Sequence, residues 1–200
     1  METFSSYLDL ISVESDRCGK ILQGLLAFSR KRDINKSAVD LTKTFQDIVL
    51  LTGNRMKLQG ICLCIDKPSI MPIVFCDGDL IKQALLNLVL NSVEAMPNGG
   101  LMVISVDLAW DAKHLIIRIQ DTGPGIPKNA RSTVFEPFFT TKKDGKGTGL
   151  GLSIVYGIML QHDGTIGVES AEGDGTTFVV TLPIGAKSLE PSAQKTEQRV

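Results

Sequence analysis

Residues 145–153 read GKGTGLGLS and join a glycine-rich loop to an apolar segment at about 149–161 that has helical spacing. A glycine-rich loop that leads into a helix N-terminus can hold a phosphate with backbone N–H groups and the helix dipole. The stretch is not a P-loop, because the Gly-Lys-Ser/Thr ending is missing. It also lacks the βαβ context of a dinucleotide-binding fold. Taken alone, the same glycine run is typical of a flexible hinge as well.

A pair of asparagines, Asn87 and Asn91, lies four residues apart in a segment predicted as a helix at about 78–96. Asp77 is the expected N-cap of this helix, and the run PNGG at 97–100 ends it. The two amides share a face that is otherwise apolar, and buried amides need hydrogen-bond partners. They either cap neighbouring backbone or bind a hard cation such as Mg²⁺ that bridges to phosphates.

The run DTGPG at 121–125 directly follows a strand predicted at 115–120. Alternating glycines let the backbone approach a ligand closely, and Asp121 can accept a hydrogen bond from an exocyclic amine. Many turns read Asp-x-Gly, so this signal is weak by itself.

The run FEPFFTTK at 135–142 places three of the 8 phenylalanines of the chain within five residues. Two interpretations stay open. The aromatic rings anchor a loop on the core, or they anchor the base of a mobile lid from which Lys142 reaches a phosphate.

Composition excludes several classes of protein. The 200 residues are 43% hydrophobic and 22% charged, with 21 Lys and Arg against 22 Asp and Glu. A net charge of -1 argues against a broad nucleic-acid footprint. The 4 cysteines are too few for a disulfide scaffold. The sequence contains neither a membrane-spanning apolar run nor a signal peptide. We therefore expect this chain in the cytoplasm without membrane contact of its own, and an upstream segment is where a full-length protein could carry a membrane anchor.

Three parts are predicted along the chain: residues 1–36, 37–184 and 185–200. The first is an amphipathic helix over about 4–32, which packs on its own domain or pairs with another chain or a missing segment. The last is a polar tail or linker. The middle part is an α/β domain. Its predicted helices are 41–52, 78–96 and 149–161, and its predicted strands are 61–65, 73–76, 101–108, 115–120, 165–170 and 176–182.

Three cysteines fall in the predicted strands. Cys62 and Cys64 point to one face of a strand, and Cys76 ends the next strand. Cys-x-Cys is not the usual zinc spacing and no histidine is near. We therefore interpret these thiols as core packing.

The four motifs, in this order, resemble those of the catalytic ATP-binding domain of two-component sensor histidine kinases, in the style of the nitrogen-regulation-like branch. That domain has the Bergerat fold shared with DNA gyrase, MutL and heat-shock chaperones. The run at 173–178, GDGTTF, is similar to the last strand turn of the family. The resemblance implies an α+β two-layer sandwich, a mixed sheet with helices on one face, after one long N-terminal helix. Residues 7–30 resemble the second helix of the family's dimerisation and histidine-phosphotransfer hairpin.

The resemblance also implies roles for individual residues. Asn91 would bind Mg²⁺, with Asn87 supporting the phosphates. Asp121 would bind the adenine amino group, Gly125 would make room for the ring, and Thr176 would contact the adenine through water. The implied catalytic residues are Asn87, Asn91 and Lys142. The set implied for ATP binding is Asn87, Asn91, Asp121, Gly123, Gly125, Ile126, Phe138, Thr141, Lys142, Gly147, Thr148, Gly149, Leu150, Gly151, Leu152 and Thr176.

Two departures refine the implied function. ATP-hydrolysing relatives carry a general-base Glu where this chain has Asn87, which favours phosphoryl transfer to a protein acceptor over hydrolysis. Glu94 is interpreted as a solvated or packing residue. The expected acceptor histidine, followed by an acidic residue and a proline, does not match His114 or His162. We therefore expect the acceptor on a hairpin outside this sequence.

The implied partners are that acceptor hairpin, a response regulator and a second copy in a full-length homodimer, and no nucleic acid is expected. Two alternatives stay open: a regulatory Bergerat module that binds nucleotide without transfer, and a serine kinase of the anti-sigma type.

Overall fold

The computed structural model describes Tyr7 and residues 34–140 and 147–185. The predicted N-terminal helix, almost all of the predicted tail, and both Thr141 and Lys142 lie outside the described residues.

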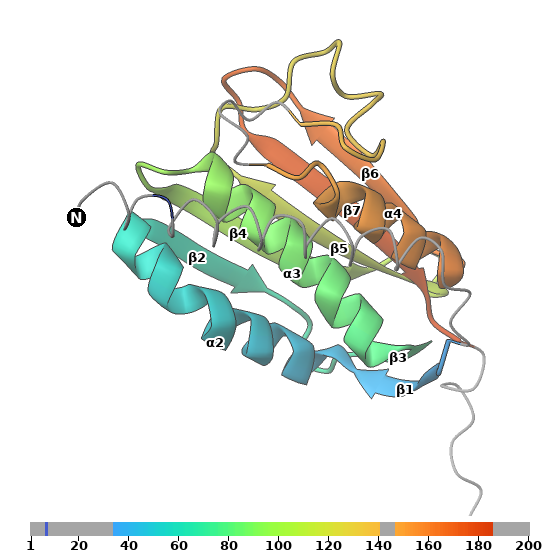
Figure 1. The fold of residues 1–200 in the computed structure, drawn as a ribbon. Coiled ribbons are helices and arrows are strands. Elements are labelled where there is room, and N and C mark those ends of the chain that lie inside the picture. The colour runs from blue at the N-terminus through green and yellow to red at the C-terminus, as the bar shows by residue number, and fades with distance from the viewer. Residues whose placement is uncertain (1–6, 8–33, 141–146, 186–200) are drawn as a thin grey trace, which may run out of the picture.

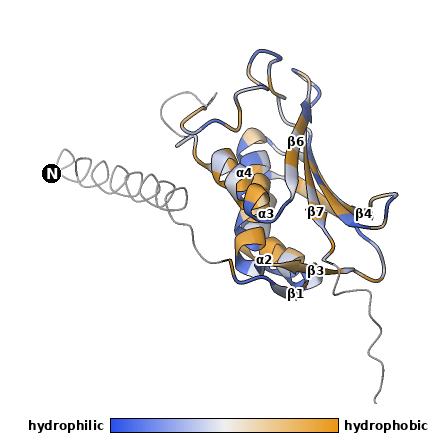
Figure 2. Ribbon diagram, turned by 90° about the vertical axis from the view of Figure 1, so that its right-hand side faces the viewer, coloured by the Kyte–Doolittle hydropathy of each residue, from blue (hydrophilic) through white to orange (hydrophobic). Residues whose placement is uncertain are grey.

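A five-stranded mixed sheet forms one layer and three helices form the other (Figure 1). The strand order is β2-β4-β5-β7-β6, with β2 and β4 parallel and all other neighbours antiparallel. The bounds are β2 Ile61–Asp66, β4 Gly100–Leu108, β5 His114–Asp121, β7 Thr176–Pro183 and β6 Thr165–Ser170, with helices α2 Leu41–Gln59, α3 Gly78–Ala95 and α4 Gly151–Gln161. All three helices cover the same face of the sheet (Figure 2). The predicted two-layer fold is therefore confirmed.

The sequence analysis missed a short strand at the start of the domain. β1 (Ser37–Asp40) pairs antiparallel with β3 (Ile73–Cys76) in a separate two-stranded sheet. Asp40 then caps α2 by accepting a hydrogen bond from the backbone N–H of Thr42 at 2.8 Å. Hydrogen bonding by Thr42, through its side chain first and its backbone N–H second, lowers the pKa of Asp40.

Helix α2 is longer than the helix predicted at 41–52. α2 continues past residue 52 because Thr52 and Met56 extend its buried stripe. It ends at Gly60, whose φ of 71° is left-handed and whose N–H bonds to carbonyls of the last turn. α3 matches its prediction closely, and Asp77 caps it by accepting from the N–H of Leu80 at 3.2 Å.

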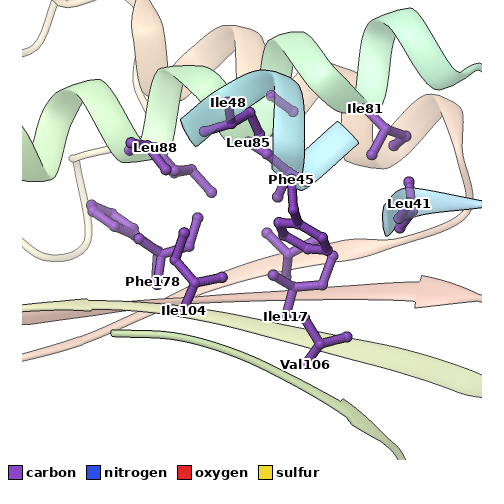
Figure 3. Close-up of a cluster of buried hydrophobic side chains, with 14 of the residues drawn as sticks. Leu41, Phe45, Ile48, Ile81, Leu85, Leu88, Ile104, Val106, Ile117 and Phe178 are labelled. Carbon is purple, nitrogen blue, oxygen red and sulfur yellow. The ribbon is translucent and has the colours of Figure 1, made fainter. Parts of the chain in front are cut away.

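The hydrophobic core lies between the helices and the sheet (Figure 3). Each strand contributes alternate residues to it, as the two-residue repeat of a strand requires. The helices contribute one stripe each. The side chains labelled in Figure 3 are Leu41, Phe45, Ile48, Ile81, Leu85, Leu88, Ile104, Val106, Ile117 and Phe178. This packing fixes the three helices against one face of the sheet.

The interpretation of the cysteines was correct for one residue only. Cys76 is buried, but Cys62 and Cys64 are exposed. They lie on the face of β2 that the helices do not cover, because the alternate residues Ile61, Leu63 and Ile65 turn inward. Among the described residues, no cluster of three His, Cys, Asp or Glu side chains is placed to hold a metal.

Candidate functional site

A cavity of about 550 Å³ lies beside α3 and brings parts of all four motifs together. Its walls come from α3, the 121–126 segment, residues 134–140, the glycine run from Gly147 and the first part of β7. Figure 1 shows these loops at one end of the sheet, opposite β1 and β3. A second hollow of about 370 Å³, lined by Gly167 and Val179 among others, lies on β6 and β7 and holds none of the motif residues.

The asparagine pair lines the cavity. Asn87, Asn91 and Ala95 recur every four residues along α3, so they share the face that looks into the cavity. Both asparagines are half-buried, and neither amide makes a hydrogen bond to any other described residue. The interpretation that they cap backbone therefore does not hold, and their oxygens are left to a ligand.

Asp121 is a buried residue that lines the cavity. It is 2% exposed, at the last position of β5, opposite Thr176 of β7. Its Oδ1 accepts from the backbone N–H of Gly123 at 2.9 Å, and its Oδ2 accepts from the hydroxyl of Ser92 at 2.7 Å. Asp121 and Thr176 both line the cavity. Sequence reasoning missed Ser92, which is 1% exposed on α3.

The loop after Asp121 is hydrogen-bonded, through Ser170, to the turn between β6 and β7. The Ser170 hydroxyl accepts from the N–H of Ile126 at 2.8 Å and donates to the carbonyl of Gly175 at 2.6 Å. Gly125 has a φ of 74°, and an added Cβ there would lie 1.9 Å from the carbonyl oxygen of Ala171. This glycine is therefore required for backbone contact with the turn, and its expected role in making room for a ring stays a prediction.

The glycine run is attached to the phenylalanine motif through the main chain. Gly149 has a φ of 65°, and its carbonyl accepts from the N–H of Phe138 at 2.9 Å. Phe138 itself is 54% exposed, and the next residue, Phe139, lines the cavity instead. Phe135 packs against Tyr156 of α4, with ring centroids 6.1 Å apart, so one ring anchors the loop as expected.

The start of α4 opens toward the cavity. α4 begins at Gly151, two residues after the predicted start, and no side chain caps its N-terminus. A Cβ added to Gly151 would lie 3.7 Å from the Nδ2 atom of Asn91, so the two motifs meet there. Uncapped N–H groups at a helix N-terminus can bind an anion.

The expected nucleotide-binding residues divide into three groups. Those that line the cavity are Asn87, Asn91, Asp121, Gly125, Ile126, Gly147, Thr148, Gly149, Gly151, Leu152 and Thr176. Three described residues do not line it: Gly123 orients the aspartate, Phe138 points outward, and Leu150 is buried at 5% exposure. Thr141 and Lys142 fall outside the described residues.

Glu94 is exposed, in agreement with its interpretation as a solvated residue. Glu94 lines the cavity one turn beyond Asn91, and its carboxylate lies 3.6 Å from the guanidinium of Arg55 on α2.

Neither described histidine is placed as a phosphoryl acceptor. His162 is 2% exposed, and both ring nitrogens are engaged, Nε2 by the Asp77 N–H at 3.0 Å and Nδ1 by the Ile158 carbonyl at 2.8 Å. His114 starts β5, seven residues before Asp121, which is about 24 Å along a strand. Its Nδ1 lies 2.7 Å from Asp111, and the pairing lowers the pKa of that aspartate, after the larger effect of the Lys113 N–H.

None of the described helices combines the length and apolarity needed to cross a bilayer.

Comparison with known proteins agrees with this geometry. Sensor kinase CckA of Brucella abortus (strain 2308) is 37% identical over 193 residues, covering 89% of this chain and 20% of that protein. Sensor histidine kinase ZraS of Escherichia coli (strain K12) is 34% identical, covering 91% of this chain and 38% of that protein. The chain thus spans between a fifth and two fifths of the length of these relatives.

Solved structures show the same fold. Full-length ShkA in complex with AMPPNP superposes with a TM-score of 0.78 at 26% identity, covering 90% of this chain and 38% of that one. The nucleotide-free catalytic domain of histidine kinase ThkA gives 0.67 at 30% identity, covering 75% of this chain and 98% of that one. Residues 76–186 match the family described as histidine kinase-, DNA gyrase B-, and HSP90-like ATPase. The chain belongs to this ATPase family and, within it, to the catalytic domains of sensor histidine kinases.

Proposed function

We propose that the cavity binds ATP together with Mg²⁺, and that the chain transfers the γ-phosphoryl group to a histidine on a hairpin outside this sequence. The proposal rests on three features of one cavity. They are a buried carboxylate, a pair of amides that bond to no described residue, and a helix N-terminus without a side-chain cap. These groups match the base, the metal-bridged phosphates and the phosphate oxygens of one nucleotide, respectively.

Asp121 would recognise the base. A buried carboxylate is an acceptor only, so it suits the exocyclic amine of adenine. Thr176 supports this assignment, because it lies opposite Asp121 in the strand register, is buried, and lines the same cavity. Ile126, also in the wall, offers the apolar surface that an aromatic base requires.

Asn87, Asn91 and the glycine run would hold the phosphates. The residues present fit Mg²⁺, because the amide oxygens are hard ligands that add no negative charge, and this ion is usually held by few protein groups together with phosphates. Asn91 would hold the ion, which when bound neutralises phosphate charge. The N–H groups at the start of α4 would bind phosphate oxygens. We assign Thr141 and Lys142 to the same end of the nucleotide.

Transfer is favoured over hydrolysis. An amide cannot take a proton from water, so Asn87 cannot act as a general base. Phosphoryl transfer to a nucleophile that is already basic, such as a neutral histidine, needs mainly positioning and charge stabilisation. The chain would provide this positioning, while the acceptor hairpin comes from the same or a partner subunit of a homodimer.

A response regulator would receive the phosphoryl group next. Histidine kinase ThkA has been solved in complex with the response regulator protein TrrA, and this chain superposes on that kinase with a TM-score of 0.75 at 27% identity. We assign the reaction to the cytoplasm, where ATP is available.

The direct test supplies the chain with radiolabelled ATP, Mg²⁺ and a separately purified hairpin that carries an acceptor histidine. We expect label on the hairpin, lost in acid and kept in base, as for phosphohistidine. Acid-stable label on a serine would support the serine-kinase alternative. ATP binding without any transfer would support the regulatory alternative. The Asn91→Asp variant should transfer poorly, since it adds a negative charge beside the phosphates.

A further inference from the structure

Asp121 is a buried carboxyl group without a cationic partner among the described residues. It is 2% exposed, and no Lys, Arg or His in the described ranges 34–140 and 147–185 forms an ion pair with it. A buried carboxylate without a counterion depends on hydrogen-bond donors. The donors around Asp121 therefore decide where its remaining lone pairs point.

Two donors hold this carboxylate, one at each oxygen. The Gly123 N–H holds Oδ1 at 2.9 Å, which orients the aspartate within its own loop. The Ser92 hydroxyl holds Oδ2 at 2.7 Å, within the range of hydrogen bonds from a hydroxyl to a charged oxygen. Only the second bond crosses to another element, since Ser92 belongs to α3 and Asp121 to β5.

The serine makes an unusual choice of partner. A serine inside a helix commonly donates to the carbonyl four residues earlier, as Thr52 of α2 does to Ile48 at 2.7 Å. Ser92 instead gives its single proton to Asp121. A hydroxyl that is 1% exposed and committed in this way fixes the rotation of the carboxyl group.

We propose that Ser92 is a positioning residue that sets the base specificity of the cavity. Resting on the proposed function, it holds Asp121 with an acceptor lone pair aimed at the position of the adenine amine. Hypoxanthine has a carbonyl oxygen at that position and cannot donate to the fixed acceptor. Ser92 therefore strengthens binding of an amine-bearing base and contributes little to a carbonyl-bearing one.

The experiment measures dissociation constants of ATP and ITP, each with Mg²⁺, for the wild-type chain and the Ser92→Ala variant by isothermal titration calorimetry. We expect the variant to bind ATP about tenfold more weakly, the typical effect of losing a hydrogen bond to a charged group. ITP affinity should be nearly unchanged, so the ratio of the ITP dissociation constant to the ATP dissociation constant should fall about tenfold. The control is Thr52→Val, which removes a buried helical hydroxyl that does not line the cavity and should keep the preference for ATP over ITP.

The outcomes separate the two proposals. If wild type binds no ATP, the proposed function fails and the specificity role fails with it. If wild type prefers ATP and folded Ser92→Ala keeps the same ATP to ITP ratio, the role of Ser92 is overturned while the proposed function stands. If Ser92→Ala does not fold, Ser92→Cys preserves the volume with a weaker donor. An unchanged ratio in that variant would overturn the role equally.

Discussion

Replacing Gly149 by alanine is expected to weaken nucleotide binding far more than it destabilises the fold. The glycine lies in the run that connects the phenylalanine motif to α4, and it lines the cavity. An added Cβ would lie 2.3 Å from the carbonyl carbon of Phe138 and 2.6 Å from its oxygen. Both contacts are with backbone, so the loop itself must move.

The magnitude follows from two local costs. A residue with a Cβ at a φ of 65° loses about 1–2 kcal/mol relative to glycine. Moving the loop also breaks the bond from the Phe138 N–H to the Gly149 carbonyl, worth about 1 kcal/mol. The sum of about 2–3 kcal/mol corresponds to about 30-fold to 150-fold in affinity. Gly149 lies outside the hydrophobic core cluster, so displacement of the loop can relieve the clash without unfolding.

The assay combines ATP titration with thermal unfolding of the same samples. The matched control is Gly53→Ala in α2, where an added Cβ meets nothing within 4 Å. That change should raise Tm by about 1–4 °C through helix propensity and leave ATP affinity unchanged. Wild-type affinity in Gly149→Ala would refute the reasoning, since it would mean that the loop geometry is not coupled to the cavity.

Two further outcomes test the surroundings of the site. Burial raises the pKa of Cys76 to about 11. Iodoacetamide at pH 8 should therefore modify the exposed Cys62 and Cys64 and spare Cys76 until the protein unfolds. Peptide mass spectrometry measures this, and modification of Cys76 in the folded state would contradict its burial. Replacing His162 by leucine leaves the Asp77 N–H unpaired and should cost about 2 kcal/mol in urea unfolding. The His162→Leu variant should still phosphorylate a supplied hairpin. Loss of phosphoryl transfer in a fully folded variant would contradict a purely structural role of His162.

The elements that carry the motifs were predictable because each has a local signal. α3 has a three- and four-residue apolar repeat between Asp77 and a Pro-Gly stop, and its predicted bounds differ from the observed ones by one residue. β5 and β7 alternate over their whole length. Since these elements frame the cavity, the positions of Asn87, Asn91 and Asp121 could be inferred without coordinates.

The remainder depends on contacts between distant residues. β1 forms because its residues pair with those of β3, as Asp40 does with Ile73. A segment of four residues is too short for its own apolar repeat to predict this pairing. Serines are common and carry no periodic signal, so Ser92 and Ser170 could not be assigned to the site. The need for glycine at position 125 could not be predicted in detail either. The group that excludes a side chain there is the carbonyl of Ala171, which lies 46 residues further along the chain.

The most direct test of the central claim is a calorimetric titration of the chain with ATP, with and without Mg²⁺, beside the Asp121→Asn variant. We expect saturable binding of ATP to the wild-type chain, and we expect Mg²⁺ to increase the affinity. Asp121→Asn presents a neutral acceptor and a new donor to the adenine amine, so binding should fall about tenfold or more. Equal affinity in wild type and Asp121→Asn, or no binding to folded wild type, would contradict the assignment of this cavity to ATP.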